Sequence, residues 1–286
     1  MRLSRGIWRP ALAATTVAAL TLGLWAFWLE PSSLTVTYES VSLCRATRRP
    51  LRIAILTDLH VGSAFNGVDK LRRAVDRTNA AQPDIVCILG DLVISRVFAG
   101  RFVAPEIIAA ELQRLQAPAG VFAVLGNHDG WFDHDRVRDA LERNGIRVME
   151  ERAARVDTAA GPLWVAGISD LWTGRHDIRT ALADVKDDHA PVILLTHNPD
   201  VFPNVPDRVA ITLAGHTHGG QVQLPIVGRL IVPSQFGQRY AAGHIVEDGR
   251  HLFVATGMGT SILPVRFRVP PAVTVLTLTC EQQDAQ

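Results

Sequence analysis

The chain has 286 residues, of which 48% are hydrophobic and 20% are charged, enough for one large domain with a substantial core and a short appendage. Its 29 basic and 28 acidic side chains give a formal net charge of +1, so no strong positive field is present and sequence-specific nucleic-acid binding is not expected. Three cysteines without a C-x-x-C pair argue against a disulfide framework or a thiolate zinc site.

The first thirty residues have the features of a membrane anchor. Residues 11–29 carry no charged side chain, over about the length needed to cross a hydrocarbon core. Arginines precede them and tryptophans stand near both ends, as in an interfacial belt. This pattern predicts an N-terminal transmembrane helix that places the protein in the cell membrane as a single-pass protein. The basic N-terminus predicts that the catalytic domain is extracytoplasmic, although arginines after residue 44 weaken the difference in positive charge between the two flanks of the helix.

A cleaved signal peptide is the alternative interpretation of this segment. Bulky residues, including Trp28 and Leu29, stand at its end, where such peptides carry small residues, and they favour an uncleaved anchor. A buried core helix is disfavoured because the segment has no polar face.

The remainder of the chain predicts a single α/β domain. Residues 34–43 partly alternate apolar and polar side chains, like an edge strand. Further on, apolar runs alternate with segments of helical spacing, which predicts a core of strands buried on both faces. The predicted organisation is an anchor at 1–30, an edge strand and linker at 31–50, a catalytic domain at 51–280 and a tail at 281–286. The predicted strands are 51–56, 85–89, 121–125, 163–168, 192–195, 209–213, 222–224, 244–246, 252–255 and 273–278, and the predicted helices are 68–78, 107–115 and 135–143.

The cysteines are interpreted separately. Cys87 lies inside the apolar run 85–89 and is interpreted as a small core residue. Cys44 and Cys280 flank the folded part and could pair if the domain lies in an oxidising compartment.

Metal-competent side chains follow five of the predicted strands. In open α/β sheets the carboxyl ends of the strands face a common crevice, where ligands bind. Each pair with D-x-H or H-x-H spacing would point to one side if its backbone stays extended. The residues are Asp58 and His60 after 51–56, Asp91 after 85–89, Asn127 after 121–125, His197 after 192–195, and His216 and His218 after 209–213.

The chemistry of this set indicates two divalent metal ions. Mixed carboxylate and imidazole ligands suit Mn, Fe or Zn, with Mn the ion to supply in vitro, and seven ligands are too many for one ion. Two ions about 3.5–4 Å apart that share a carboxylate can activate a bridging water to attack phosphorus. One such residue alone is more often a helix cap or turn former, and a structural zinc site would leave three ligands unexplained. Their joint placement favours the dinuclear site.

The order and spacing of these motifs resemble the calcineurin-like metallophosphoesterase superfamily, whose signature is D-x-H, G-D, G-N-H-[DE], a lone H and G-H-x-H. The resemblance spans residues 51 to about 218. Residues 215–221, 257–260 and 264–267 extend it toward a bacterial branch of membrane-associated or exported members. It implies a four-layer α-β-β-α sandwich of two mixed β-sheets, preceded here by the transmembrane helix.

The resemblance also implies a role for each residue. His128 resembles the general acid that protonates the leaving alkoxide, and Asp129 would orient it. Many relatives continue the Gly90-Asp91 motif with an acidic or polar pair, whereas residues 92–95 here read Leu-Val-Ile-Ser, which bears on substrate contacts rather than on metal binding. The implied ligand sets are Asp58, His60 and His218 for the first ion, Asp91 as the bridge, and Asn127, His197 and His216 for the second.

The expected function is hydrolysis of a phosphodiester, phosphomonoester or pyrophosphate by a metal-bridging hydroxide, on a membrane- or envelope-associated substrate that includes lipid-linked ones. Arg175, in a polar loop after 163–168, could grip a phosphate bidentately, with a solvated surface arginine as the alternative. One alternative function is a UDP-2,3-diacylglucosamine pyrophosphatase-like activity in lipid A synthesis, which conflicts with an extracytoplasmic domain. Another is a non-catalytic scaffold, although this chain keeps every ligand that such relatives typically lose.

Overall fold

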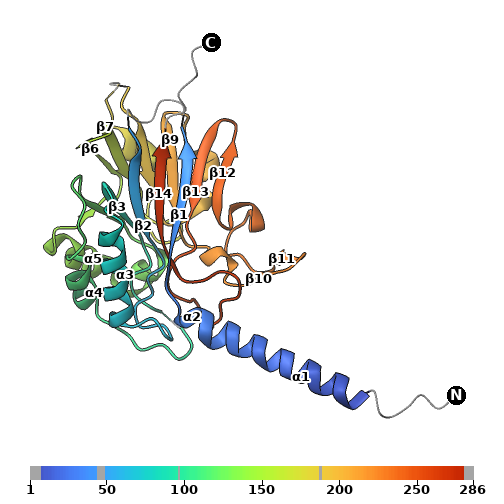
Figure 1. The fold of residues 1–286 in the computed structure, drawn as a ribbon. Coiled ribbons are helices and arrows are strands. Elements are labelled where there is room, and N and C mark those ends of the chain that lie inside the picture. The colour runs from blue at the N-terminus through green and yellow to red at the C-terminus, as the bar shows by residue number, and fades with distance from the viewer. Residues whose placement is uncertain (1–7, 44–48, 96, 187–188, 280–286) are drawn as a thin grey trace.

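The computed structural model describes residues 8–43, 49–95, 97–186 and 189–279, in which two mixed six-stranded sheets pack face to face (Figure 1). Helices lie outside the first sheet, and shorter helical segments lie outside the second. The expected four-layer sandwich is therefore confirmed. Cys87 is buried in the core as expected, while Cys44 and Cys280 lie outside the described residues, as do the tail residues.

The first sheet has the strand order β1-β14-β2-β3-β4-β5. Neighbouring strands run parallel except β14 and β2, which are antiparallel. As predicted, β1 is an edge strand, and its partner β14 comes from the other end of the chain. The bounds are β1 Thr35–Ser42, β2 Leu51–Leu56, β3 Ile85–Leu89, β4 Val121–Val124, β5 Arg147–Val148 and β14 Ala272–Thr279.

The second sheet has the order β12-β13-β9-β8-β7-β6, and a two-stranded hairpin, β10–β11, lies outside both sheets. The four central strands run parallel, whereas β12 and β6 are antiparallel to their neighbours. β6 was not predicted because it contains no apolar run. The bounds are β6 Arg152–Thr158, β7 Gly161–Gly167, β8 Val192–Leu195, β9 Val209–Ala214, β10 Gln223–Leu224, β11 Gly228–Arg229, β12 Gly243–Glu247 and β13 Arg250–Val254.

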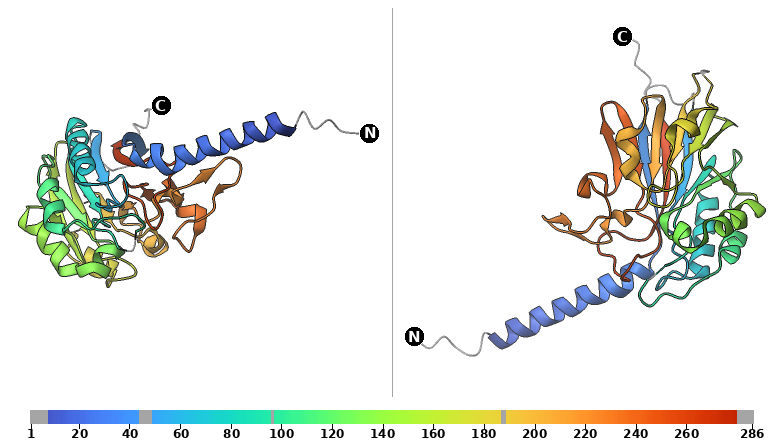
Figure 2. Two further views of the ribbon diagram at one scale, coloured as in Figure 1. Left: turned by 90° about the horizontal axis from the view of Figure 1, so that it is seen from below. Right: turned by 180° about the vertical axis from the view of Figure 1, so that it is seen from behind.

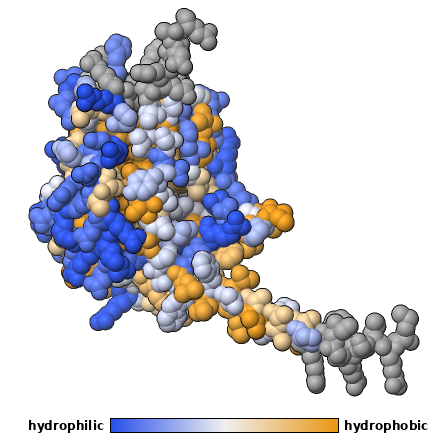
Figure 3. All heavy atoms as spheres, in the orientation of Figure 1, coloured by the Kyte–Doolittle hydropathy of each residue, from blue (hydrophilic) through white to orange (hydrophobic). Residues whose placement is uncertain are grey.

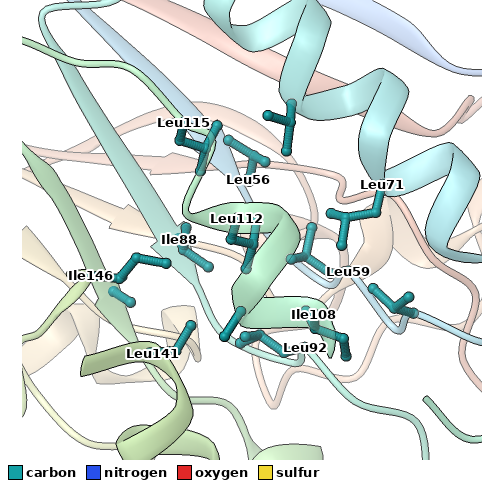
Figure 4. Packing of buried hydrophobic residues seen from close by; sticks show 14 of the residues in the cluster. Leu56, Leu59, Leu71, Ile88, Leu92, Ile108, Leu112, Leu115, Leu141 and Ile146 are labelled. Atoms are coloured by element: carbon teal, nitrogen blue, oxygen red, sulfur yellow. The ribbon is translucent and has the colours of Figure 1, made fainter. Parts of the chain in front are cut away.

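Apolar side chains on alternate positions of each central strand supply two different cores. In β2, Ile53 and Ile55 point into the core between the sheets, whereas Ala54 and Leu56 point into the core under the helices. Figure 4 shows the second of these cores, where Leu56 and Ile88 from the sheet meet Leu112 from a helix. Burial on both faces explains why these strands read as continuous apolar runs.

The helices over the first sheet follow the expected positions in two of three cases. α3 (Val68–Ala80) and α4 (Pro105–Leu112) match the predicted helices, but α5 (Asn127–Arg143) begins well before residue 135 and is kinked at Asp133. The Gly-Asn-His-Asp segment, residues 126–129, forms the N-cap and the first turn of α5. The elements outside the second sheet are α6 (Ile178–Leu182) and the 3₁₀ segments η2 (Pro199–Asn204) and η4 (Gly237–Tyr240), and η3 (His218–Gly220) follows β9.

The N-terminal segment forms a continuous helical rod made of α1 (Trp8–Leu24), the π-helical η1 (Trp25–Leu29) and α2 (Glu30–Ser32). Residues 10–32 are long and apolar enough to cross a membrane and are not buried inside the protein over the most apolar window. The rod projects away from the sandwich in all three views (Figures 1 and 2). Its inner end is fixed by a hydrogen bond of 2.9 Å from the Arg266 backbone N–H to the Ala26 carbonyl.

Candidate metal centre

All seven predicted ligands lie at the carboxyl ends of strands, at one end of the sandwich. Asp58 and His60 follow β2, Asp91 follows β3, and Asn127 opens α5 immediately after β4. The second sheet contributes the remaining three, His197 after β8 and His216 and His218 after β9. The ligand side chains are buried, so the two sheets meet at a cluster of polar groups with little exposed surface.

The backbone at these residues differs from the extended conformation that the sequence suggested. Asp58, His60 and Asp91 have φ values of 48°, 36° and 54°, and His216 and His218 have values of 71° and 51°. These are left-handed conformations, which non-glycine residues seldom adopt and which concentrate at functional sites. Tight left-handed turns, rather than strand alternation, bring each pair to the centre.

The first group of ligands surrounds one point between the sheets. His60 Nε2 lies 3.1 Å from His218 Nε2 and 3.4 Å from Asp91 Oδ2. His218 Nε2 lies 3.3 Å from Asp58 Oδ1. One ligand atom from each of the four residues fits within 4.8 Å of the others, a spacing that suits a shared cation.

The second group lies beside the first and shares Asp91 with it. Asp91 Oδ2 is 3.3 Å from His197 Nε2, which is itself 3.1 Å from His216 Nδ1 and 3.1 Å from Asn127 Oδ1. The same carboxylate oxygen therefore faces both groups. Asp91 would therefore be shared by the two ions if each group held one.

Hydrogen bonds to the outer ring nitrogens orient two of the histidines. His60 Nδ1 lies 3.3 Å from the Val93 carbonyl, and His197 Nδ1 lies 2.7 Å from the Leu89 carbonyl. A carbonyl can only accept, so Nδ1 carries the proton in both rings and Nε2 presents its lone pair to the centre. Protein backbone thus selects the tautomer that binds a metal.

Buried atoms without a hydrogen-bond partner test whether the residues fit metal ions. Asp58 Oδ1, which faces the first ligand group, is such an atom among the described residues. Asp58 Oδ2, by contrast, accepts from Thr57 Oγ1 at 2.9 Å and from the His216 backbone N–H at 3.0 Å. One oxygen is thus fixed by the protein and the other points at the ligand cluster, and an unpaired buried carboxylate oxygen is costly unless a cation binds it. The residues fit a pair of divalent ions.

Burial and the interactions among the ligands shift the pKa values of the cluster in both directions. Burial raises the pKa of Asp58 to about 7. Burial would also raise the pKa of Asp91, but the adjacent His197 and His60 hold it well below its usual range. Burial opposes charge on His197, yet Asp91 and Asp58 raise its pKa to about 10. Burial lowers the pKa of His60 and of His216 to about 3, so both are neutral imidazoles at pH 7.

His128 lies at the edge of the cluster, where Ser95 contacts its ring. The Ser95 backbone N–H donates to His128 Nδ1 at 3.2 Å, and the Ser95 hydroxyl lies 2.8 Å from the same nitrogen. Burial lowers the pKa of His128, which makes its protonated form a stronger acid. Ser95 was not predicted as a functional residue, because in the sequence it only ends the unusual run at residues 92–95.

Asp129 does not take the position that the sequence assigned to it. Its Oδ1 accepts from the backbone N–H groups of Leu92 and Val93 at 2.9 and 3.2 Å, and its Oδ2 accepts from Gly126 N–H at 3.0 Å. The expected orienting contact with His128 is therefore replaced by Ser95. Asp129 instead fastens the loop after β3 to the first turn of α5, because its side chain at the third position of the helix points back toward the helix start.

The loop after β13 packs beneath the first ligand turn. A Cβ atom on Gly257 would overlap Asp58, and one on Gly259 would overlap His60. Fully buried Arg266 secures this loop, because its guanidinium donates to the carbonyls of Thr256, Gly257, Gly259 and Val269 at 2.6–3.2 Å. The sequence singled out residues 257–260 and 264–267 only by resemblance, and the structure gives them this supporting role.

A cavity of about 730 Å³ opens onto the ligand cluster. Its floor includes Asp91, His128 and His218, and its walls are largely apolar. The sequence did not identify these wall residues, since isolated exposed apolar side chains carry no distinctive pattern. The apolar wall residues are Trp131, Trp172, Ile231, Pro233 and Ile262.

Arg175 is placed by the structure outside this cavity. It is exposed, and its loop presents Trp172 rather than Arg175 among the cavity residues. The Arg175 backbone N–H donates to Ser169 Oγ at 2.8 Å, which holds the turn of the loop. A phosphate contact by Arg175 stays a prediction, and the solvated position fits the alternative interpretation.

Comparison with known proteins gives consistent matches. The sequence profile described as calcineurin-like phosphoesterase matches residues 51–220. An uncharacterized metallophosphoesterase of Bacillus subtilis, YkuE, is 30% identical over 93% of both chains, and the phosphodiesterase YaeI of Escherichia coli is 28% identical over 96% of this chain and 99% of its own. Among solved structures, the NAD nucleotidase of Haemophilus influenzae matches 73% of this chain with a TM-score of 0.51 and 13% identity. This chain spans less than half of that nucleotidase, so the likeness shows the shared fold alone.

Proposed function

This chain belongs to the calcineurin-like phosphoesterase family, and from that premise we propose that it hydrolyses phosphodiesters with two divalent metal ions. The observation that carries the proposal is the pair of adjoining ligand groups that share Asp91 Oδ2. Phosphomonoester and pyrophosphate hydrolysis use the same arrangement and remain within the proposed reaction class. The phosphodiesterase name of the E. coli relative supports the phosphodiester as the first substrate to test.

The proposed ligands fall into two sets, one for each ion, with one residue shared between the sets. Asp58, His60 and His218 would hold one ion and Asn127, His197 and His216 the other, with Asp91 between them. When bound, the two ions, with manganese proposed for assay, supply an activated water and neutralise charge on the phosphate oxygens. Burial of the ligands keeps bulk water from screening these charges.

His128 is the proposed general acid. It lines the cavity next to the ligand cluster, and its Nδ1 is occupied by Ser95, which leaves Nε2 to deliver a proton to a leaving alkoxide. The Ser95 hydroxyl can accept from Nδ1 of the protonated ring, whereas the Ser95 backbone N–H can donate to Nδ1 only when that nitrogen carries no proton. In this proposal Asp129 acts on His128 only through the backbone that it holds.

We test the proposal with a nitrophenyl phosphodiester and an alkyl phosphodiester in the presence of Mn²⁺. Asp91→Asn should abolish turnover of both, because it removes the shared carboxylate charge. His128→Ala should lower turnover of the alkyl ester by about 10²-fold or more, because an alkoxide needs protonation to leave. Asp157→Asn and His251→Ala are matched controls on exposed or half-exposed positions outside the cavity. Bound metal without turnover of any phosphoester would favour the scaffold alternative.

We also propose that the helical rod is an uncleaved membrane anchor and that the substrate is associated with the membrane or envelope. The length and apolar character of residues 10–32 support the anchor. The rod is also tied to the catalytic domain, since Glu30 is buried and its carboxylate accepts from Trp25 Nε1 and from the Val269 backbone N–H, both at 2.6 Å. N-terminal sequencing of the membrane-extracted protein would contradict the anchor if it began after residue 30.

A further inference from the structure

A band of exposed apolar side chains borders the mouth of the metal-site cavity. It comes from the β10–β11 hairpin, from the residues just after the hairpin, and from the loop after β13. Figure 3 shows apolar surface at the tip of the hairpin and along the nearby helical rod. Soluble proteins seldom leave such a concentration of large apolar side chains in water without a partner. We define the apolar belt as Ile226, Val227, Leu230, Ile231, Ile262 and Leu263, whose exposed fractions range from 49% to 107%.

Two members of the apolar belt are held in a strained backbone conformation. Ile226 has a φ of 70° and Ile262 a φ of 62°. β-Branched residues are outliers in this region, where glycine or asparagine would fit without strain. Ile226 is fully exposed and Ile262 is 70% exposed, so neither gains enough from the protein core to offset the strain. Their side chains therefore point to a contact made outside the chain.

The apolar belt is continuous with the inner end of the helical rod. The loop that carries Ile262 continues to Arg266, whose backbone N–H donates to Ala26 in the rod. One residue further, the Phe267 carbonyl accepts from the Gln223 N–H at 2.9 Å, where the β10–β11 hairpin begins. In all three views the hairpin projects toward the same side as α1 (Figures 1 and 2). A bilayer that receives the rod would therefore also meet the apolar belt.

The charge around the apolar belt matches an anionic lipid surface. Residues 219–246 and 255–271, the two segments that carry the apolar belt, contain no aspartate or glutamate, and their arginines other than buried Arg266 are Arg229, Arg239 and Arg268. Arg239 is paired with Glu247, so Arg229 and Arg268 are the cations that these two segments offer beside the apolar belt. Basic groups beside inserted apolar side chains are the usual features of a protein surface that docks on anionic lipids.

The apolar belt also leads directly into the catalytic cavity. Ile231 and Ile262 belong both to the belt and to the cavity wall, together with Trp131 and Trp172. A lipid that moves from the headgroup layer toward the metal ligands would contact the apolar residues of the cavity wall. A small hydrophilic phosphoester would gain little from these walls.

We propose that the apolar belt docks on an anionic lipid bilayer and opens the metal-site cavity onto its headgroups, so that the site takes phosphodiesters carried on lipids. The docking part stands on the surface alone, whereas the substrate part rests on the proposed phosphodiesterase function. Hydrolysis would add water across the P–O bond and release a headgroup and a phosphate-bearing or hydroxyl-bearing lipid, without a further co-reactant.

The docking part is tested with a spin label on the full-length protein in vesicles of phosphatidylethanolamine and phosphatidylglycerol. Val227→Cys places the label on the belt, and Val246→Cys places it on β12, where the native side chain is equally exposed at 52% against 54%. Cys44 and Cys280 are replaced by serine, and buried Cys87 is kept. We expect the label at 227 to collide with oxygen more than with an aqueous nickel chelate, and the reverse at 246. Equal accessibility to the nickel chelate at both positions would overturn docking.

The substrate part is tested by comparing phosphatidylglycerol in vesicles with a soluble nitrophenyl phosphodiester. We expect Val227→Asp to lower hydrolysis of the vesicle substrate by about tenfold while the soluble substrate is cleaved at the wild-type rate, and Val246→Asp to change neither. Ile226→Asn should also lower the vesicle rate while its melting temperature stays equal or rises, which excludes misfolding as the cause. Cleavage of the soluble ester without cleavage of the vesicle lipid would overturn the lipid substrate. Cleavage of neither would refute the proposed function, and the spin labels would still decide docking.

Discussion

Five of the seven proposed ligands have left-handed backbone conformations, and each non-glycine residue in that region costs about 1–2 kcal/mol. The strain persists because neighbouring groups fix the side chains, as the Val93 carbonyl fixes His60 and the Thr57 hydroxyl fixes Asp58. Glycine is required where the backbone must approach these turns, since a Cβ on Gly215 would overlap Thr57. At this scale the protein holds the ligands in place before any ion arrives, which lowers the reorganisation needed for binding.

Ser95 is predicted to act as a positioning residue for His128. Ser95→Ala should lower turnover of an alkyl phosphodiester by about tenfold and leave a nitrophenyl ester nearly unchanged, because nitrophenolate leaves without a proton. Steady-state kinetics on the two substrates measure this ratio. Ser261→Ala is the matched control, since Ser261 also lines the cavity but does not contact His128 through any observed hydrogen bond. An equal loss on both esters would contradict the positioning role.

Metal loading is predicted to release protons. In the metal-free centre the pKa of Asp58 is raised to about 7 by burial, and that of His197 is raised to about 10 by Asp91 and Asp58 against the effect of burial. Both groups must lose their protons to bind a cation, so protons compete with metal and the affinity for Mn²⁺ should fall as the pH is lowered through 7. Calorimetric titration in buffers of different ionisation enthalpy should show release of about one to two protons per centre at pH 7. A pH-independent affinity would contradict this assignment.

At the scale of the elements, the loop after β13 joins the helical rod to the first ligand turn. The Glu30 carboxylate at the end of the rod accepts a hydrogen bond from the Val269 backbone N–H. The Arg266 guanidinium donates to backbone carbonyls of the loop, and Gly257 of the same loop contacts Asp58. Burial lowers the pKa of Arg266 to about 10, so the guanidinium remains charged at neutral pH. A buried guanidinium that donates hydrogen bonds to several backbone carbonyls stabilises the loop, and its removal would leave those carbonyl oxygens without partners.

Replacing Arg266 is therefore predicted to destabilise the protein. Arg266→Met should lower the free energy of unfolding by about 3 kcal/mol or more, because several buried carbonyls lose their donors. Arg268→Met changes an exposed arginine in the same loop and should stay within about 0.5 kcal/mol of wild type. Denaturant unfolding of both variants gives the comparison. Equal stability of the two variants would show that the hydrogen bonds of Arg266 are not needed for the stability of the protein.

At the scale of the whole molecule, the centre lies on the seam between the two sheets. Asp58, His60, Asp91 and Asn127 come from the first sheet, and the three other histidines come from the second. The apolar core between the sheets stabilises the rest of the interface between them. Ions bound by both sides would therefore stabilise the packing of one sheet on the other as well as serve the reaction.

Removal of metal is predicted to lower the melting temperature. Ions present at about 100 times their dissociation constant contribute about 2.7 kcal/mol, which for a domain of this size corresponds to about 5–10 °C. Thermal unfolding with Mn²⁺ and with a chelator measures the difference. Asp91→Asn should show a much smaller difference, since it weakens both ion sites, and an equal difference would place the stabilising ions elsewhere.

The sequence by itself determined the buried strands and the proposed ligand set, because both depend on local patterns, whereas the four layers were implied by the family resemblance. Strands buried on both faces must be apolar throughout, so β2, β3 and β8 could be located almost to the residue, and the polar groups that end them stood out by contrast. Tertiary structure decided what depends on distant contacts: the left-handed turns at Asp58 and His216, the pairing of Ser95 with His128, and the placement of Arg175 outside the cavity. It also gathered the apolar belt, whose members are separated in sequence and become one surface only because the loop after β13 lies against the β10–β11 hairpin.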